Sequence, residues 1–329
     1  MHALPACSVQ RPRSIAQACQ LLADNTASRL IAGGTDLLPN LRRGLEHPTN
    51  LVDLSALQGM DTVDNAADGA LVLGAGVTLA RIAGDPVIAR AVPTLADAAR
   101  AAAGPGHRSA ATLGGNLCQD TRCVFYNQSE WWRAANHYCL KRGGDTCHVA
   151  PQGARCHAAF SGDLAPVLLV LQAEVGLSSV RGARTLALTD LYRDDGAAHL
   201  TLAADEVMTC VRLPAAPAGQ VCAYRKARVR GAMDFPLAGV AVALRCAEGA
   251  LQSLLIAISG VASRPVVVAG LDTLIGQPVD TAMLATIGKA VQKQVSPMRS
   301  TITDSNYRRQ VARILAQRLV HTLAHGVAT

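Results

Sequence analysis

Apolar positions recur every three or four residues in the first part of the chain, which is the period of a helix. Residues 14–24 carry such a stripe, and Ser14 with Gln17 fits a capping box at its start. Short apolar runs follow, and these predict strands at 29–32 and 51–54 with a short helix at 39–43 between them. The alternation predicts a small α/β lobe over residues 1–57.

A second series of short apolar runs predicts another lobe over residues 58–213. Its expected strands are 71–75, 173–177, 184–188 and 207–213, and its expected helices are one capped by Thr78, one over 94–103 and one over 164–171. The Ala-rich helix at 94–103 begins after Pro93 and is expected to end at Gly104-Pro105-Gly106.

Beyond a Pro/Ala linker at 214–219, the order of elements changes. Strands are predicted at 223–229, 237–244 and 251–258, and helices at 282–292 and 306–323. Strands followed by helices argue for an α+β domain over residues 220–329.

Composition narrows the class of protein. The 329 residues suit two or three domains, and 50% hydrophobic with 17% charged residues argues against disorder. The net charge of +7 comes from scattered Lys and Arg residues without interleaved aromatics, so nucleic acid is not expected as a partner. No apolar run reaches the ~18 residues of a membrane span, and Met1–Pro5 does not resemble a secretory leader. We therefore expect a cytoplasmic protein whose cysteines are metal ligands and buried thiols, not disulfides.

Residues 111–166 have a composition unlike the rest of the chain. They hold five of the ten cysteines and six of the ten aromatic residues: Cys118, Cys123, Cys139, Cys147 and Cys156, with Phe125, Tyr126, Trp131, Trp132, Tyr138 and Phe160. Such a segment predicts a small core built around something other than hydrocarbon. The two tryptophans are either part of that core or a screen against water.

The spacing of these cysteines favours an iron–sulfur cluster over zinc. Zinc sites commonly use close C-x₂₋₄-C pairs, and Cys118 with Cys123 is the closest spacing here. Widely spread thiolates suit a [4Fe–4S] cube, which presents separate irons to separate segments. Five cysteines are one too many for one cube. Two alternatives stay open: buried thiols without metal, and zinc with help from His137, His148 or His157.

Two Gly-rich turns are candidates for binding an anion. The turns are Gly33-Gly34-Thr35-Asp36 and Thr112-Leu113-Gly114-Gly115-Asn116, and each is predicted to follow a strand, one in each lobe. Glycines with residues that favour helix N-caps let backbone N–H groups approach an anion. Neither turn is a G-x-G-x-x-G fingerprint or a P-loop. A dinucleotide held between two lobes needs donors on both sides of its pyrophosphate, and these turns are placed to supply them.

Four stretches carry a resemblance to a known family. They are Ala32–Asn40, Ala111–Cys123, Phe125–Trp132 and Asp234–Val240. In these stretches, and along essentially its whole length, the chain resembles the flavin subunits of the xanthine oxidase family of molybdenum enzymes, and among them the β subunits of 4-hydroxybenzoyl-CoA reductases. The resemblance implies a two-lobed FAD-binding domain of the PCMH type, similar to the CO dehydrogenase flavoprotein. It also implies a [4Fe–4S] loop inserted at about 118–160 and a C-terminal α+β domain.

The resemblance also assigns roles to residues. FAD would be lined by Leu30, Ile31, Ala32, Gly33, Gly34, Thr35, Asp36, Leu37, Thr112, Leu113, Gly114, Gly115 and Asn116. Asp163 would contact the adenosine part or its ribose, and Lys226 would lie near the isoalloxazine, although a lysine at that place is otherwise a solvated strand charge. The cluster ligands would be Cys123, Cys139, Cys147 and Cys156, with Cys118 to spare. No catalytic residue is expected on this chain.

The implied function is electron transfer in an enzyme that reductively dehydroxylates 4-hydroxybenzoyl-CoA to benzoyl-CoA during anaerobic degradation of aromatic compounds. Molybdopterin would sit on a large partner subunit and [2Fe–2S] clusters on a small one, in a dimer of heterotrimers served by a low-potential donor such as ferredoxin. Two alternatives differ from this: an FAD subunit of a molybdenum hydroxylase acting on another aromatic substrate, and a zinc-stapled interaction module. The sequence does not fix the direction of electron flow.

Overall fold

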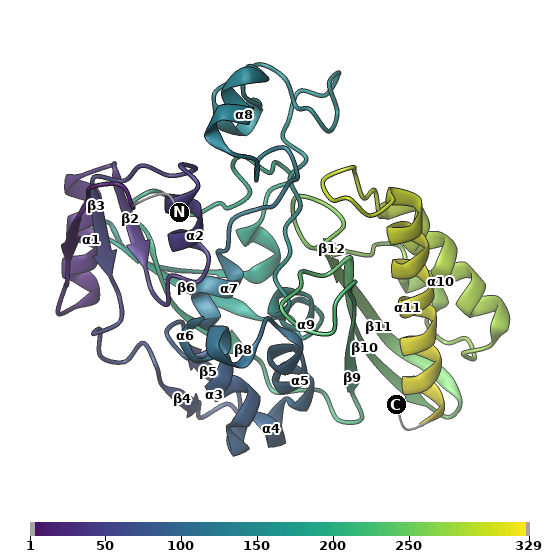
Figure 1. Cartoon of the computed structure of the whole chain (residues 1–329). Helices are drawn as coiled ribbons and strands as arrows, with labels where there is room; N and C mark the ends of the chain where they lie inside the picture. The colour runs from purple at the N-terminus through teal and green to yellow at the C-terminus, as the bar shows by residue number, and fades with distance from the viewer. Residues whose placement is uncertain (1–3, 327–329) are drawn as a thin grey trace.

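The computed structural model describes residues 4–326, so the first three residues of Met1–Pro5 and the last three of the chain lie outside the described part. Three sheets organise the chain (Figure 1). The strands and helices predicted above are confirmed to within a few residues at each end. None of the helices within residues 4–326 is both long and apolar enough to cross a bilayer.

The first lobe is a three-stranded parallel sheet in the order β1-β3-β2. Its strands are β1 (Ser8–Gln10), β2 (Ser28–Ile31) and β3 (Asn50–Asp53), and its helices are α1 (Ile15–Asp24) and α2 (Leu37–Arg42). Ser14 caps α1 by accepting a hydrogen bond from the N–H of Gln17, as the capping box predicts. Strand β1 was not predicted, because all three of its residues are exposed and show no apolar pattern.

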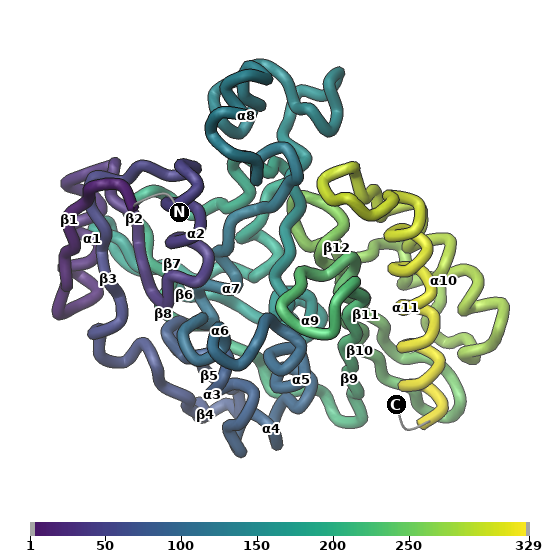
Figure 2. Tube along the Cα trace, viewed as in Figure 1, coloured from purple at the N-terminus to yellow at the C-terminus, as the bar shows by residue number. Residues whose placement is uncertain are grey.

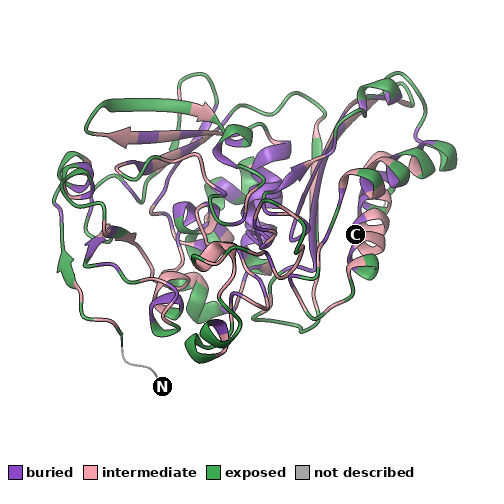
Figure 3. Cartoon of the chain, turned by 90° about the horizontal axis from the view of Figure 1, so that it is seen from above, coloured by how far each residue is buried: buried purple, intermediate pink, exposed green. Residues whose placement is uncertain are grey.

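The second lobe is a five-stranded antiparallel sheet in the order β4-β5-β8-β6-β7. The strands are β4 (Val63–Asn65), β5 (Leu71–Gly74), β6 (Glu174–Ser179), β7 (Gly182–Ala187) and β8 (Val207–Leu213). Its helices are α3 (Leu79–Gly84), α4 (Pro86–Ala91), α5 (Pro93–Ala101), α6 (Pro105–Ala110), α7 (Leu113–Leu117) and α9 (Leu164–Val170), with the 3-10 turn η2 (Leu188–Leu191). Every residue of α9 is buried, which places this helix at the centre of the molecule (Figure 3).

The third sheet belongs to the C-terminal region and is antiparallel in the order β12-β11-β10-β9. It comprises β9 (Val221–Ala227), β10 (Ala238–Ala247), β11 (Ala250–Ser259) and β12 (Val266–Val267), followed by η3 (Asp272–Leu274), α10 (Thr281–Gln294) and α11 (Ser305–His325). Both faces of β10 are buried. Val240 and Val242 belong to the core shared with α10 and α11, whereas Ala241 and Ala243 belong to the core of the FAD-binding lobes. Small alanines on that second face let α9 lie close to the sheet.

The cysteine-rich segment projects from the second lobe, at the top of Figures 1 and 2. Its regular elements are α8 (Glu130–Ala135) and the 3-10 turn η1 (Leu140–Arg142). The two ends of the segment are paired, because Arg122 and Ala159 exchange backbone hydrogen bonds of 2.8 and 2.7 Å. The segment contacts both neighbours: Arg133 donates to the carbonyl of Arg43 in the first lobe, and the N–H of Val124 donates to Ser300 of the C-terminal region.

A candidate flavin cradle and a buried cysteine cavity

The first Gly-rich turn lies where the two lobes meet. A Cβ added to Gly33 would lie 1.9 Å from the carbonyl oxygen of Ala110 at the end of α6, so no side chain fits at this position. Gly34 has a φ of +67°, which favours glycine, and its carbonyl accepts the N–H of Leu38 at 3.0 Å. The turn therefore brings the backbone of the first lobe against the residues that precede the second turn.

The second Gly-rich turn does not end a strand, which corrects the expectation above. It is preceded by α6 and opens the short helix α7, where Thr112 caps by accepting the N–H of Gly115 at 3.1 Å. Thr112 followed by two glycines produces this cap, because the hydroxyl satisfies a free N–H of the first turn. The N–H groups of Leu113 and Gly114 donate to lobe carbonyls, at 2.8 Å each. The N–H of Asn116 also has a protein acceptor, the carbonyl of Thr112, so residues 113–116 offer no free N–H to an anion, contrary to the expectation for this turn.

Asp163 and Lys226 were expected at different parts of FAD, and the structure pairs them with each other. Lys226 Nζ lies 2.9 Å from Asp163 Oδ1, and the hydroxyl of Tyr224 donates to the same carboxylate at 2.8 Å. All three residues are largely buried, and burial raises the pKa of Asp163 even though Lys226 acts to lower it. The contacts of Asp163 and Lys226 with FAD stay predictions, since protein donors already bind both carboxylate oxygens.

Sequence reasoning missed the role of Tyr224. The signal was available in the strand period: residues 224 and 226 lie two apart on β9 and so share a face. Because Asp163 directly precedes α9, the network joins the C-terminal sheet to the central helix. Asn116 of the second turn lies next to it, accepting the N–H of Leu164 at 3.2 Å. Asn116, Asp163 and Lys226 therefore meet at the N-terminal end of α9.

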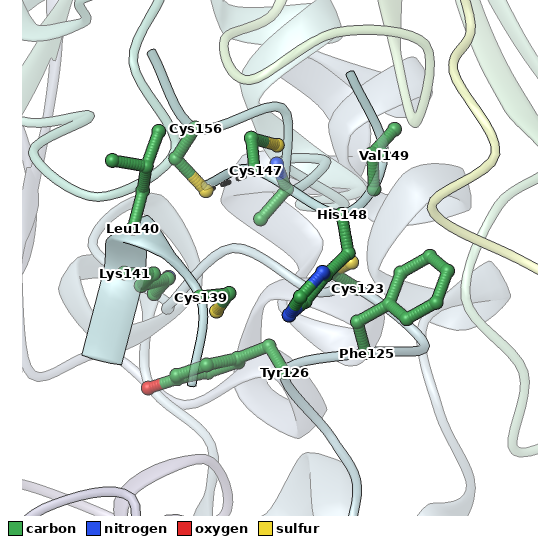
Figure 4. A pocket seen from close by; sticks show the side chains of 11 residues that line it. Cys123, Phe125, Tyr126, Cys139, Leu140, Lys141, Cys147, His148, Val149 and Cys156 are labelled. Atoms are coloured by element: carbon green, nitrogen blue, oxygen red, sulfur yellow. Dashed lines mark hydrogen bonds between the residues drawn. The ribbon is translucent and has the colours of Figure 1, made fainter. Parts of the chain in front are cut away.

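Four of the predicted cysteines line a single cavity inside the projecting segment (Figure 4). Cys123, Cys139, Cys147 and Cys156 come from four separate stretches of chain and surround the same space. Cys118 does not line this cavity and lies at the C-terminal end of α7. None of the cysteines in residues 4–326 forms a disulfide.

The loop after η2 fixes the last of these cysteines. The N–H of Cys156 donates to Asp195 at 3.2 Å, and its carbonyl accepts the N–H of Gly196 at 2.9 Å. A Cβ on Gly196 would lie 2.8 Å from the backbone of Ala158, so only glycine allows this contact. Burial raises the pKa of Cys156 to about 11 and also raises that of Cys123, so both are protonated thiols at neutral pH. A metal that binds them has to displace those protons.

The three histidines considered as zinc ligands are placed differently from one another. Of these, His148 lines the cavity, where its Nε2 bonds to the carbonyl of Tyr138 at 2.7 Å. His137 and His157 do not line it. Within residues 4–326, no group of three or more His, Cys, Asp or Glu side chains converges on a single metal ion. A cube makes a different demand, because each of its four thiolates binds its own iron.

Long basic side chains, not predicted from the sequence, hold the cavity walls. Lys141 is 6% exposed, donates to Asp120 and to the carbonyl of Gly196, and lies 4.5 Å from the centre of the Tyr126 ring. Arg133 is 1% exposed and donates to several backbone carbonyls and to Glu130. Nothing in residue type separates such an arginine from a solvated one, so tertiary contacts alone reveal it.

The tryptophans of α8 do not form a buried core. Trp131 is 78% exposed. Trp132 packs on Phe125 with ring centroids 6.1 Å apart, and Phe125 in turn lines the cavity. Of the two alternatives for Trp131, membership of the core is wrong. Only Trp132 lies against the cavity wall.

Comparison with known proteins identifies the two parts of the chain. Residues 5–216 match the family described as the FAD binding domain in molybdopterin dehydrogenase, and residues 222–323 match the CO dehydrogenase flavoprotein C-terminal domain. The nicotine 6-hydroxylase medium subunit of Paenarthrobacter nicotinovorans is 32% identical over 78% of this chain and 75% of its own length. The xanthine dehydrogenase FAD-binding subunit of Escherichia coli O157:H7 is 26% identical over 95% of this chain and 94% of its own.

Solved structures give the same answer. A chain of quinoline 2-oxidoreductase from Pseudomonas putida 86 is 26% identical and superposes with a TM-score of 0.78, covering 98% of this chain and 99% of that one. Carbon monoxide dehydrogenase from Hydrogenophaga pseudoflava shares the fold, with a TM-score of 0.81 over 99% of this chain and 100% of that one, at 21% identity. The chain therefore belongs to the xanthine oxidase family of molybdenum hydroxylases, as one of its FAD-binding subunits.

Proposed function

We propose that this subunit carries both FAD and a [4Fe–4S] cluster, and passes electrons within a molybdenum enzyme that reductively dehydroxylates 4-hydroxybenzoyl-CoA to benzoyl-CoA. One observation carries the proposal: four thiols from four stretches of an inserted segment line one buried cavity. An iron–sulfur cube is held by four thiolates, each on its own iron, so its ligands are spread around a space. The donor set is all sulfur, as such a cluster prefers.

The chain's own residues have distinct tasks in this scheme. Cys123, Cys139, Cys147 and Cys156 would hold the cluster, which when bound supplies one-electron transfer. Phe125 and Val149 line the same cavity and exclude water from it. Lys141 places a buried positive charge at the wall, favourable beside anionic thiolates.

The flavin cradle is proposed at the junction of the lobes. Residues 30–37 and 112–116 would line the pyrophosphate side, with Asp163 and Lys226 on the side nearest α9. Gly34→Val tests this, because valine at a φ of +67° is strained and its side chain meets Leu38. We expect Gly34→Val to lose FAD while the cluster spectrum is kept. A variant that retains one FAD per chain would remove this turn from the cradle.

The substrate and the assembly are inferred from chemistry and resemblance. Reducing an aromatic ring takes low-potential single electrons, and a cluster beside a flavin gives the flavin a one-electron route. The relatives named above are medium or FAD-binding subunits, in keeping with a molybdopterin-binding large partner and a [2Fe–2S] small partner. We propose a cytoplasmic dimer of heterotrimers served by a donor such as ferredoxin.

A second candidate is the FAD subunit of a molybdenum hydroxylase that oxidises another aromatic substrate. The names of the chain's relatives favour this second candidate, since they refer to xanthine, nicotine and quinoline. A hydroxylase of this kind needs no cluster in this subunit. The cysteine cavity favours the first candidate, and the cluster therefore separates the two.

The test measures the absorbance and EPR spectra and the iron content of the purified complex. Iron that remains in the cysteine variants belongs to the partner subunits and is subtracted. Cys123→Ser, Cys139→Ser, Cys147→Ser and Cys156→Ser are each expected to lose four irons per chain and one EPR signal of the dithionite-reduced complex, while FAD stays. Dehydroxylation of 4-hydroxybenzoyl-CoA with a low-potential donor should fall with them. An unchanged iron content in all four variants would overturn the proposal that this subunit binds a cluster. A parent complex with its full iron content that does not dehydroxylate 4-hydroxybenzoyl-CoA would overturn the proposed substrate.

A further inference from the structure

Arg122 lies between the two proposed cofactor sites. It directly precedes Cys123, and its backbone closes the base of the inserted segment by pairing with Ala159. Its side chain, 11% exposed, reaches back to the first lobe. There Nη2 donates to the carboxylate of Asp36, and Nη1 donates to Asn40 Oδ1 at 2.7 Å.

Asp36 is the last residue of the first Gly-rich turn. It precedes α2 at the N-cap position, where an aspartate usually accepts from its own helix, but its side chain makes no such bond. One of its oxygens accepts Arg122, and the other accepts the N–H of Asp120 at 2.9 Å. The carboxylate is thus bound on both sides by the base of the inserted segment. A charge-assisted link of this kind has a defined geometry.

We propose that the Arg122–Asp36 link makes Arg122 a positioning residue that couples the two cofactor sites. The inference rests on the proposed function, since it assumes that both cofactors bind. An ordered Gly33–Asp36 turn fixes the carboxylate of Asp36, and their ion pair then fixes the side chain of Arg122. Arg122 in turn sets the position of the neighbouring ligand Cys123. Coupling free energy is reciprocal, so FAD then stabilises the bound cluster by the same free energy by which the cluster strengthens FAD binding.

The experiment measures the release of cluster iron from the assembled complex to a chromophoric iron chelator, with FAD bound and after its removal by a chaotropic salt. In the parent complex we expect removal of FAD to speed iron release on the order of tenfold, because the bound cluster loses the coupling free energy while the released iron does not, which lowers the barrier to release. In Arg122→Gln the two rates should converge. Arg122→Lys should restore part of the difference, because lysine keeps the charge but not the planar fork.

Matched controls keep the outcome specific. Arg181 next to β7 forms a two-pronged but exposed pair with Asp205, so Arg181→Gln removes an Arg–Asp link that touches neither proposed site and should keep the tenfold difference. Where Arg122→Gln does not fold, Asp36→Asn breaks the link from the other side and should also bring the rates together. Full coupling retained in Arg122→Gln or in Asp36→Asn would overturn the inference. So would a parent with both cofactors whose iron release is independent of FAD, whereas a parent without cluster iron would overturn the proposed function itself.

Discussion

The cysteine-rich segment of residues 123–158, which the proposal above treats as an inserted segment, and the C-terminal region are stabilised in opposite ways. The C-terminal sheet and its two helices share a large apolar core that includes Val240, Ile256, Ile287 and Val320. The core of the inserted segment is small, and two of its members, Cys123 and Cys156, are proposed metal ligands. Burying apolar area stabilises by roughly 25 cal/mol per Å², so the inserted segment gains little from this source.

Hydrogen bonds from basic side chains to backbone carbonyls take the place of that core. Arg133 donates to the carbonyls of Arg43 and Gln128, Arg142 to that of Leu45, and Lys141 to that of Gly196. Each such bond contributes only about 1–3 kcal/mol net, because water competes for both partners. These bonds fix where the segment sits, but they leave the walls of the cysteine cavity dependent on what fills it.

The largest effect is predicted for a substitution in the cysteine cavity. Cys147→Ser should lose the cluster iron, and with it the order of residues 124–155, because no other core holds the walls. Hydrogen exchange should rise throughout that segment and stay unchanged in α10 and α11. Cys118→Ser is the matched control, since Cys118 lies outside the cavity, and it should keep both iron and protection. Protection retained in the iron-free Cys147 variant would show that the segment folds unaided.

A substitution that creates a cavity in the C-terminal apolar core should instead lower stability without loss of iron. Ile287 is fully buried in α10, and Ile287→Ala should lower the free energy of unfolding by about 2–5 kcal/mol. Iron and FAD content should not change, because Ile287 packs on the face of the C-terminal sheet opposite to the face that contacts α9. Urea unfolding with parallel iron analysis measures both quantities. Loss of iron in the folded variant would show that the two regions are not independent.

The same contrast explains what could be predicted from the sequence. Elements such as β10 and α10 follow apolar periodicity, and both were located to within a few residues. The concentration of cysteines between residues 118 and 156 indicated a shared site, and the family resemblance named the four that line the cavity. The links of Arg122 to Asp36 and of Lys226 to Asp163 could not be predicted, since each joins residues more than sixty apart by charge alone.

Acid should weaken the base of the inserted segment. His199 Nε2 donates to the carbonyl of Gln119, and burial lowers the pKa of His199 from 6.5 to about 4, with Lys141 adding to the effect. Between these pH values the unfolded chain binds a proton that the folded chain does not, so stability is lost as pH falls through this window, by about 3 kcal/mol. His199→Gln should remove that part of the pH dependence of the urea midpoint. An unchanged pH dependence in this variant would contradict the assignment.

The smallest effects are predicted for removing one helix N-cap side chain in each of the two regions. Asp280 caps α10 by accepting the N–H of Met283 at 2.8 Å, and Ser129 caps α8 by accepting the N–H of Trp132 at 3.3 Å. Asp280→Ala should lower the free energy of unfolding by about 1 kcal/mol, since α10 is part of the apolar core. Ser129→Ala should instead speed amide exchange within α8 by about fivefold and leave the unfolding midpoint unchanged, because α8 opens locally while the rest stays folded. Equal shifts of the midpoint in the two variants would mean that α8 unfolds together with the apolar core, and the inserted segment would then owe its order to the fold and not to its occupant.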